Sequence, residues 1–195
     1  MELYEAIRGR RSVRQFQDRP VEQERLERIL DAALWAPSAH NAQAWRFTVA
    51  RGETKRAIER AMVEAAEGAE ARGESLPGFK ATARLIGAAP VLIAAFHFRS
   101  EPIRLRETYA LRELLLLSAQ IQSVAAAIEN LLLAAHAEGL GAVWIGYTNL
   151  IAARLKEILG EDGFPVAAVA LGYPRQAPPA PERKPRPERV VLRGA

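Results

Sequence analysis

The sequence predicts one compact domain in which helices and buried strands are mixed. With 195 residues, of which 49% are hydrophobic and 26% charged, the chain has the size and composition of a single globular domain. Residues 90–98 (PVLIAAFHF) and 166–172 are short runs that are apolar on both faces, as buried strands are. Between them, apolar residues repeat at three- and four-residue spacing from Tyr109 to about Ala137. This pattern predicts a helix about 40 Å long.

This helix is apolar on nearly every side, so nearly every side must be covered. Polar residues, among them Gln120 and Glu129, interrupt the run of about 20 apolar residues that a membrane span requires. We therefore expect a core or dimer-interface helix rather than a membrane helix. It ends at Glu138-Gly139, with Gly139 in the left-handed conformation. The strand that follows, Ala142–Tyr147, contains Gly146, which leaves room for another group to approach the backbone.

The other elements follow from local patterns along the chain. Residues 2–9 predict a short helix with Leu3, Ala6 and Ile7 inward, and residues 21–35 predict an amphipathic helix with Leu34 on its apolar face. Residues 54–72 are helical but have a poor apolar face. We therefore expect the section up to residue 89 to be a mobile cover rather than part of the core. Further helices are expected at residues 80–88 and 149–159, and further strands at residues 45–51 and 190–192.

Composition and missing motifs exclude several classes of protein. The chain has no cysteine, which excludes disulfides, thiolate zinc sites and cysteine nucleophiles. It has no dinucleotide-binding glycine motif after a strand, no P-loop, no H-E-x-x-H and no G-x-S-x-G. The N-terminal residues lack the apolar core of a signal peptide, which predicts a cytoplasmic protein. His40, His97 and His136 lie far apart and are expected to be structural, so no metal site is predicted. Glu129 is expected to contact an arginine.

The basic residues are concentrated near the two ends of the chain. The net charge is +4, and arginines gather at residues 8–14 and 183–193. The preference for arginine over lysine favours planar, bidentate contacts with phosphate or carboxylate groups. The tail at residues 176–187 is too rich in proline for regular structure.

Five stretches, taken in order, carry a more specific signal. They are RRSVRQF at residues 10–16, APSAHNAQAW at residues 36–45, residues 126–146, ALGYP at residues 170–174, and KPR at residues 184–186. Each motif is weak alone, but their order and spacing resemble the nitroreductase family of FMN-dependent oxidoreductases. The resemblance covers nearly the whole chain except about residues 54–89. Ala44 stands where the family usually has a proline.

The resemblance implies an α+β fold, with a central, mainly antiparallel sheet flanked by helices, in an intertwined homodimer. Residues 1–175 would form the FMN-binding domain, with residues 54–89 as its variable cover. Residues 176–195 would form an arm that wraps the partner subunit. The long helix would be the spine of the dimer, and one FMN would lie at each of two sites between the subunits.

The resemblance also implies which residues hold the flavin. Arg10, Lys184 and Arg186 would bind the FMN phosphate, and Arg11 and Ser12 would contact the ribityl–phosphate region. Arg14 would stabilise the negative charge that reduction builds at N1 and O2 of the ring.

A second group would surround the ring itself. Ile145 and Gly146 would present a backbone N–H to flavin N5, while Pro37, Ser38, His40 and Asn41 of the other subunit would close over the ring. No catalytic side chain is expected, because flavin N5 does the chemistry.

The activity implied is transfer of a hydride from NADH or NADPH through flavin N5 to a small acceptor in ping-pong order. A nitroaromatic, a quinone or free flavin would fit as the acceptor. Neither nucleic acid nor membrane is expected as a partner. Two alternatives stay open. One is other flavin chemistry known in the family, namely dehalogenation or breakdown of the flavin, and the other is a colourless, basic nucleic-acid-binding protein.

Overall fold

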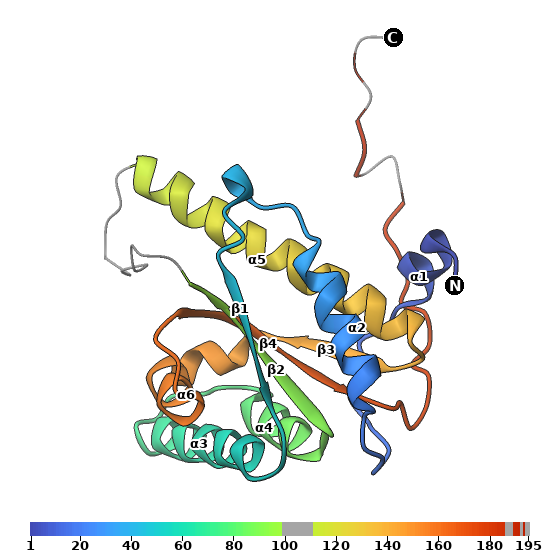
Figure 1. Cartoon of the computed structure of the whole chain (residues 1–195). Coiled ribbons are helices and arrows are strands. Elements are labelled where there is room, and N and C mark those ends of the chain that lie inside the picture. The colour runs from blue at the N-terminus through green and yellow to red at the C-terminus, as the bar shows by residue number, and fades with distance from the viewer. Residues whose placement is uncertain (99–110, 186–188, 192, 194–195) are drawn as a thin grey trace.

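A computed structural model describes residues 1–98, 111–185, 189–191 and 193, and its centre is a four-stranded sheet (Figure 1). The strands lie in the order β1-β2-β4-β3, and every neighbouring pair is antiparallel. Their bounds are Trp45–Ala50 for β1, Val91–His97 for β2, Gly141–Ile145 for β3 and Phe164–Gly172 for β4. The predicted α+β fold with an antiparallel sheet is therefore confirmed.

Two layers of helices cover the two faces of the sheet, and alternate residues of β2 point into each layer. Leu92, Ala94 and Phe96 belong to the core beneath α3 (Gly52–Ala71), α4 (Phe79–Ala88) and α6 (Ala152–Leu159). Val91, Ile93 and Ala95 belong to the core beneath α2 (Gln23–Leu34) and α5 (Leu111–Ala137). This explains why every residue of β2 is apolar except the last. The remaining elements are α1 (Leu3–Gly9) and the short 3₁₀ helices η1 (Ala39–Asn41) and η2 (Tyr147–Ile151).

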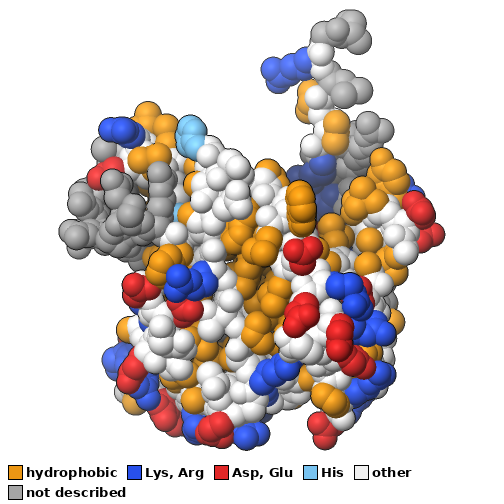
Figure 2. Space-filling view, in the orientation of Figure 1, with side chains coloured by type: hydrophobic (Ala, Val, Ile, Leu, Met, Phe, Trp, Pro, Cys, Tyr) orange, Lys and Arg blue, Asp and Glu red, His pale blue; other side chains and the backbone are white. Residues whose placement is uncertain are grey.

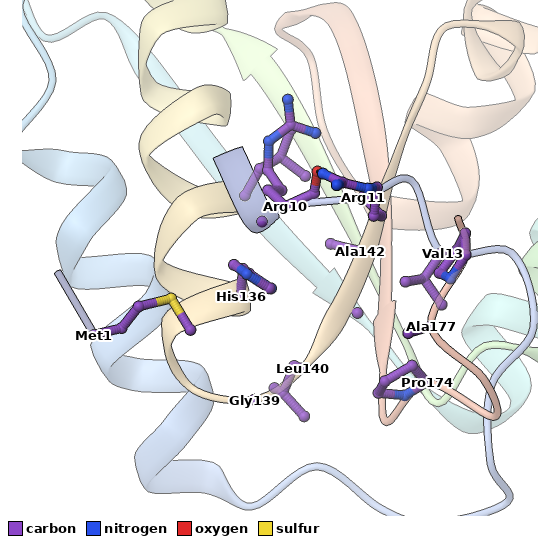
Figure 3. A pocket seen from close by; sticks show the side chains of 14 residues that line it. Met1, Arg10, Arg11, Val13, His136, Gly139, Leu140, Ala142, Pro174 and Ala177 are labelled. Carbon is purple, nitrogen blue, oxygen red and sulfur yellow. The ribbon is translucent and has the colours of Figure 1, made fainter. Parts of the chain in front are cut away.

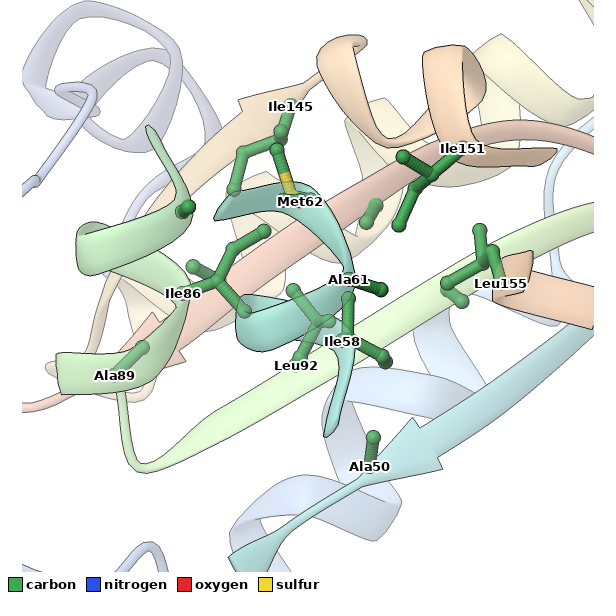
Figure 4. Close-up of a cluster of buried hydrophobic side chains, with 14 of the residues drawn as sticks. Ala50, Ile58, Ala61, Met62, Ile86, Ala89, Leu92, Ile145, Ile151 and Leu155 are labelled. Carbon is green, nitrogen blue, oxygen red and sulfur yellow. The ribbon is translucent and has the colours of Figure 1, made fainter. Parts of the chain in front are cut away.

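The expectation that residues 54–89 lie outside the core is wrong. Ile58 and Met62 of α3 and Phe79 and Ile86 of α4 are all fully buried, and Figure 4 shows several of these side chains meeting Leu92 of the sheet. The apolar face of α3 looks poor because alanines fill much of it. Alanine nevertheless lets two helices approach closely, so the few large side chains are enough to close the layer.

The long helix is covered along only part of its length. Its fully or nearly buried residues begin at Val124, whereas Leu111, Leu114, Leu115 and Leu116 are each 43–74% exposed. Figure 2 shows hydrophobic side chains gathered where this end of α5 leaves the body of the molecule. By length and composition α5 could cross a membrane, but core helices pass the same test, and its C-terminal half packs on the sheet. The predicted residues 109 and 110 lie outside the described part.

Smaller predictions were corrected at the ends of elements. Leu3 and Ile7 of α1 are 62% and 49% exposed, and only Ala6 is buried there; Leu34 at the end of α2 is 51% exposed. A strand was predicted at residues 190–192, but Val190 and Val191 are not in one, and residue 192 lies outside the described part. Gly139 has φ +75°, so the predicted left-handed end of α5 is confirmed.

Candidate functional site

The site expected from the N-terminal motif is built where Ser12 and Val13 dock against the free edge of β3, near the beginning of that strand. The backbone N–H of Val13 donates to the carbonyl of Ala142 at 3.0 Å, and Ser12 pairs with Ala142 in a parallel bridge. A Cβ atom at Gly141 would lie 2.7 Å from Cβ of Val13, so only glycine allows this approach. This contact fixes Ser12 and Val13 at the beginning of β3, and Arg10, Arg11 and Arg14 lie on either side of them in the sequence.

Arg10 lies at the beginning of this segment, beside a cavity of about 250 Å³ (Figure 3). Its Nε atom is 3.3 Å from Oε1 of Glu129 on α5, so the predicted arginine contact of Glu129 is confirmed. Within the described residues the same Nε atom is buried and makes no hydrogen bond. Arg11 also borders the cavity, and its Nη1 donates to the carbonyls of Arg8 and Arg10 at 2.6 and 2.8 Å.

His136 of α5 borders the same cavity (Figure 3) and lies close to the backbone of Gly9, the residue before Arg10. Burial lowers the pKa of His136, and the nearby guanidinium groups of Arg11 and Arg10 lower it further. The imidazole is therefore neutral at pH 7. An anionic group in this cavity would be attracted by the positive charges of the arginines. From the sequence we expected His136 to be structural. His136 and Arg11 are 125 positions apart, so no sequence pattern indicated that they border the same cavity.

The other end of the segment turns away from β3. Phe16 pairs with Pro174 in an antiparallel bridge, and the N–H of Gln17 donates to the carbonyl of Tyr173 at 2.8 Å. Arg14 is exposed, and its Nη1 lies 3.4 Å from the carbonyl of Ser12. Ile145 is buried as the last residue of β3, whereas the next residue, Gly146, is exposed. A Cβ atom at Gly146 would meet nothing within 4 Å among the described atoms. The backbone of Gly146 therefore borders open space.

A second group of expected site residues lies in the loop between α2 and β1. Three residues there have left-handed backbone conformations, namely His40 (φ +55°), Asn41 (φ +51°) and Gln43 (φ +47°). Their side chains are exposed, as is that of Pro37, while Ser38 is half-buried. The backbone N–H of Ala39 donates to Oγ of Ser123 on α5 at 3.1 Å, so the loop is attached to the long helix.

The structure thus separates the twelve predicted site residues into groups. One group lies beside β3, and a second lies in the loop attached to α5. Lys184 is exposed in the tail, and Arg186 lies outside the described residues. No group of three or more histidine, aspartate or glutamate side chains in the described part is placed to hold a metal ion. The group beside β3 comprises Arg10, Arg11, Ser12, Arg14, Ile145 and Gly146, and the loop comprises Pro37, Ser38, His40 and Asn41.

Comparison with known proteins gives consistent matches. The family model described as "Nitroreductase family" matches residues 7–173. A protein of Methanothermobacter thermautotrophicus, provisionally named NADH dehydrogenase/NAD(P)H nitroreductase, is 33% identical over 184 residues, or 91% of this chain and 80% of its own. A 5,6-dimethylbenzimidazole synthase of Rhodospirillum rubrum is 31% identical over 199 residues, covering 94% of this chain and 90% of that protein. The solved FMN complex of a provisionally named nitroreductase from Desulfovibrio desulfuricans has a TM-score of 0.76 and 30% identity, and covers 100% of this chain and 98% of its own.

Proposed function

The chain belongs to the nitroreductase family, and from this premise we propose that it is an FMN-dependent oxidoreductase that uses NADH or NADPH to reduce a small acceptor. Two observations carry the proposal. Arg10 and Arg11 border a cavity at the beginning of the edge strand β3, and the exposed backbone of Gly146 directly follows the end of that strand. This arrangement would fit a ligand with a phosphate in the cavity and a flat ring beside Gly146.

The residues present suit the phosphate end of FMN. A phosphate monoester carries nearly two negative charges at neutral pH and favours several cationic donors. Arg10 offers a buried Nε that makes no hydrogen bond within the described residues, and we assign Lys184 and Arg186 of the tail as its partners. Each charge-assisted hydrogen bond contributes about 1.5–3 kcal/mol. Arg11 and Ser12 would contact the ribityl chain of FMN, which connects the phosphate to the ring.

At the ring end, Arg14 and the backbone of Gly146 would set the electronic environment. When bound, the flavin supplies the chemistry by accepting a hydride at N5 and returning two electrons to the acceptor. Arg14 would stabilise negative charge on the pyrimidine side of the ring. The N–H of Gly146 would donate toward N5, and the absence of a side chain there leaves the approach open. Ile145 would fix the position of the Gly146 backbone, because its side chain is buried in the core.

The exposed leucines of α5 support a second proposal, that of a partner subunit. Four of the six residues from Leu111 to Leu116 are exposed leucines, and clustered apolar side chains of this kind are typical of interaction surfaces. We propose that a second copy covers these leucines, giving a homodimer in the cytoplasm. In that dimer Pro37, Ser38, His40 and Asn41 of one subunit would cover the flavin of the other. The arm at residues 176–195 would lie across the partner, outside the domain formed by residues 1–175.

One comparison favours a second candidate function. The relative from Rhodospirillum rubrum is a 5,6-dimethylbenzimidazole synthase. The dimethylated benzene ring with two nitrogens in that product corresponds to one end of a flavin ring system, so breakdown of a flavin is the alternative activity. Analysis of the products separates the two. An oxidoreductase leaves its flavin intact over many turnovers, whereas a synthase consumes it and forms the benzimidazole.

The visible spectrum of the purified protein tests the proposal first. A yellow protein that is bleached by NADH or NADPH without oxygen, and that regains its colour on addition of a nitroaromatic or a quinone, is expected. A colourless protein that does not take up FMN would contradict it and would leave nucleic-acid binding as the use of the basic residues.

The Arg10→Ala variant tests the phosphate assignment. We expect FMN affinity to fall by on the order of 10- to 100-fold, as follows from losing about 1.5–3 kcal/mol. The matched control is Arg8→Ala, which removes an exposed arginine on α1 that does not border the cavity. Equal affinities for the parent and the Arg10 variant would place the phosphate elsewhere.

A further inference from the structure

The loop that carries His40 and Asn41 has a backbone conformation that is uncommon for residues other than glycine, although asparagine and histidine adopt it more often than most. Non-glycine residues with positive φ are uncommon, and three of the four residues from His40 to Gln43 have it. Such conformations persist only where surrounding groups fix them, and they gather at functional sites. The question is which groups fix this loop.

Ser123 is the contact between the loop and the body of the protein. Its Oγ accepts the backbone N–H of Ala39, the first residue of η1, at 3.1 Å. The same hydroxyl donates to the carbonyl of Ala119 at 2.7 Å, so both its position and its rotation are set by α5. The two partners Ala39 and Ser123 are 84 positions apart in the chain. Both Ser123 and Ala39 are half-buried.

Hydrogen bonds inside the loop continue from this anchor to the exposed side chains. The backbone N–H of Asn41 donates to the carbonyl of Ser38, and that of Gln43 donates to Oγ of Ser38, both at 3.0 Å. Nε2 of Gln43 donates to Oδ1 of Asn41 at 3.1 Å. This last bond uses the acceptor of the Asn41 amide and leaves its NH₂ group facing outward as a donor.

The position of Ser123 along α5 determines where on the molecule the loop is attached. The buried half of α5 begins at the next residue, Val124, and the exposed leucines precede Ser123 on the same helix. The loop is therefore attached where the covered half of the helix meets the half that we assign to the partner subunit. In the proposed dimer, a loop attached at this boundary would lie close to the partner subunit.

We propose that Ser123 is a positioning residue of the flavin site, which holds the loop so that Asn41 donates its NH₂ group to the ring bound by the partner subunit. The proposal rests on the proposed function. Ser123 does not touch the flavin; it acts through Ala39 and the left-handed turn. Gln43 completes the arrangement by orienting the Asn41 amide. The flavin carbonyls, which only accept hydrogen bonds, are the groups that such a donor fits.

The test compares Ser123→Ala with Ser123→Thr. Alanine removes the hydroxyl, whereas threonine keeps it and can still bond the preceding turn of the helix. In the flavin-free protein, hydrogen exchange of the Ala39 amide should become faster in the alanine variant and return to the parent value in the threonine variant. In the FMN-loaded protein, the alanine variant should show a shifted flavin absorption band. Its kcat with NAD(P)H should fall on the order of 10-fold, because small displacements of reacting groups cost rate steeply.

Ser118→Ala is the matched control. Ser118 lies on the same helix, but its Oγ accepts a hydrogen bond from Nε2 of Gln122 at 2.6 Å and not from the backbone of the loop. This variant should keep the parent's absorption band and kcat. Gln43→Glu provides a second test on an exposed residue that packing does not need. It replaces the donor to Asn41 with an oxygen, so the band and kcat should shift in the same direction as in Ser123→Ala.

The outcomes separate this proposal from the proposed function. If the parent protein takes up FMN and is reduced by NAD(P)H, but Ser123→Ala and Gln43→Glu keep its band and kcat, then the positioning role is wrong and the function stands. If the parent binds no FMN, the function fails first. A faster Ala39 amide in Ser123→Ala would then show only that Ser123 anchors the loop, and the role toward a flavin would be overturned.

Discussion

The protein has room for a side chain at position 146. The φ and ψ of Gly146, −87° and −22°, are ordinary for any amino acid, and a Cβ atom would meet nothing within 4 Å. The variant Gly146→Val should therefore fold with nearly the parent's melting temperature. Its isopropyl group would occupy the space that we assign to the flavin ring. We expect the rate of flavin reduction by NAD(P)H to fall on the order of 100-fold, as for a displacement of about 1 Å.

The measurement is anaerobic bleaching of the flavin in a stopped-flow instrument, after flavin occupancy has been matched. Gly146→Ala serves as the graded control, because one methyl group should cost less than an isopropyl group. A valine variant that is fully loaded and reduced at the parent's rate would remove Gly146 from the reactive side of the ring.

At this scale the sequence identified single residues well where their role is local. Gly139 was predicted as a left-handed helix end because the signal lies within a few positions of it. The left-handed residues His40, Asn41 and Gln43 could not be predicted. Their loop is hydrogen-bonded to Ser123, which lies on a helix far along the chain, and no local pattern reports such a partner.

Among the elements, the beginning of α2 and the end of β4 are connected by one polar contact. Tyr173 donates to Oε2 of Glu22 at 2.6 Å, and the guanidinium of Arg19 lies 3.7 Å from the centre of the Tyr173 ring and pairs with Oε1 of Glu22 at 2.9 Å. The hydrogen bond from Tyr173 is the first cause that lowers the pKa of Glu22 from 4.5 to about 2. A backbone hydrogen bond and Arg19 lower it further.

Because of this contact, the free energy of unfolding should depend on pH in the acid range. The folded protein holds the Glu22 pKa below its unfolded value. The contribution of Glu22 to the free energy of unfolding is therefore complete above pH 4.5 and is lost as the pH falls toward 2. In Tyr173→Phe the pKa of Glu22 should rise toward 4.5, so stability at pH 7 should decrease and the loss between pH 4.5 and 2 should become smaller.

Urea unfolding between pH 2 and 7 measures both effects. Tyr147→Phe is the control, because the Tyr147 hydroxyl donates to the carbonyl of Pro77 at 2.9 Å and not to a carboxylate. It should lower stability equally at every pH. A Tyr173→Phe protein that shows the parent's pH dependence would mean that another group keeps the Glu22 pKa low.

Elements were predicted more reliably than the layers they form. All four strands and the main helices appear near their expected positions, because their periodicity is a property of adjacent residues. The place of α3 and α4 was missed. Burial of an alanine-rich face depends on the helix that packs against it, and the sequence of one helix does not contain that information.

On the scale of the whole molecule, the arm is the part whose role depends on the second subunit. If Lys184 and Arg186 hold the FMN phosphate, deleting residues 181–195 should lower flavin content at limiting FMN. It should also lower the melting temperature of the FMN-loaded protein, because bound ligand stabilises the native state. Flavin absorbance after gel filtration and thermal unfolding with excess FMN measure the two effects.

The flavin-free protein is the internal control for the arm. Without FMN, the truncated and full-length chains should melt at similar temperatures, since residues 181–185 are exposed and none lies in a helix or strand. Full flavin content and an unchanged melting temperature of the loaded, truncated protein would show that the arm takes no part in binding.

The order of strands in the sheet has a consequence for how the chain is made. β2 is buried on both faces and is paired along both edges, yet 66 residues, from 98 to 163, separate it from its partner β4. At about 5–20 residues per second, a ribosome needs roughly 3 to 13 s to reach β4. During that interval an apolar strand with one open edge can pair only with β1, so the nascent chain is most exposed to aggregation, and most dependent on chaperones, before its last strand emerges.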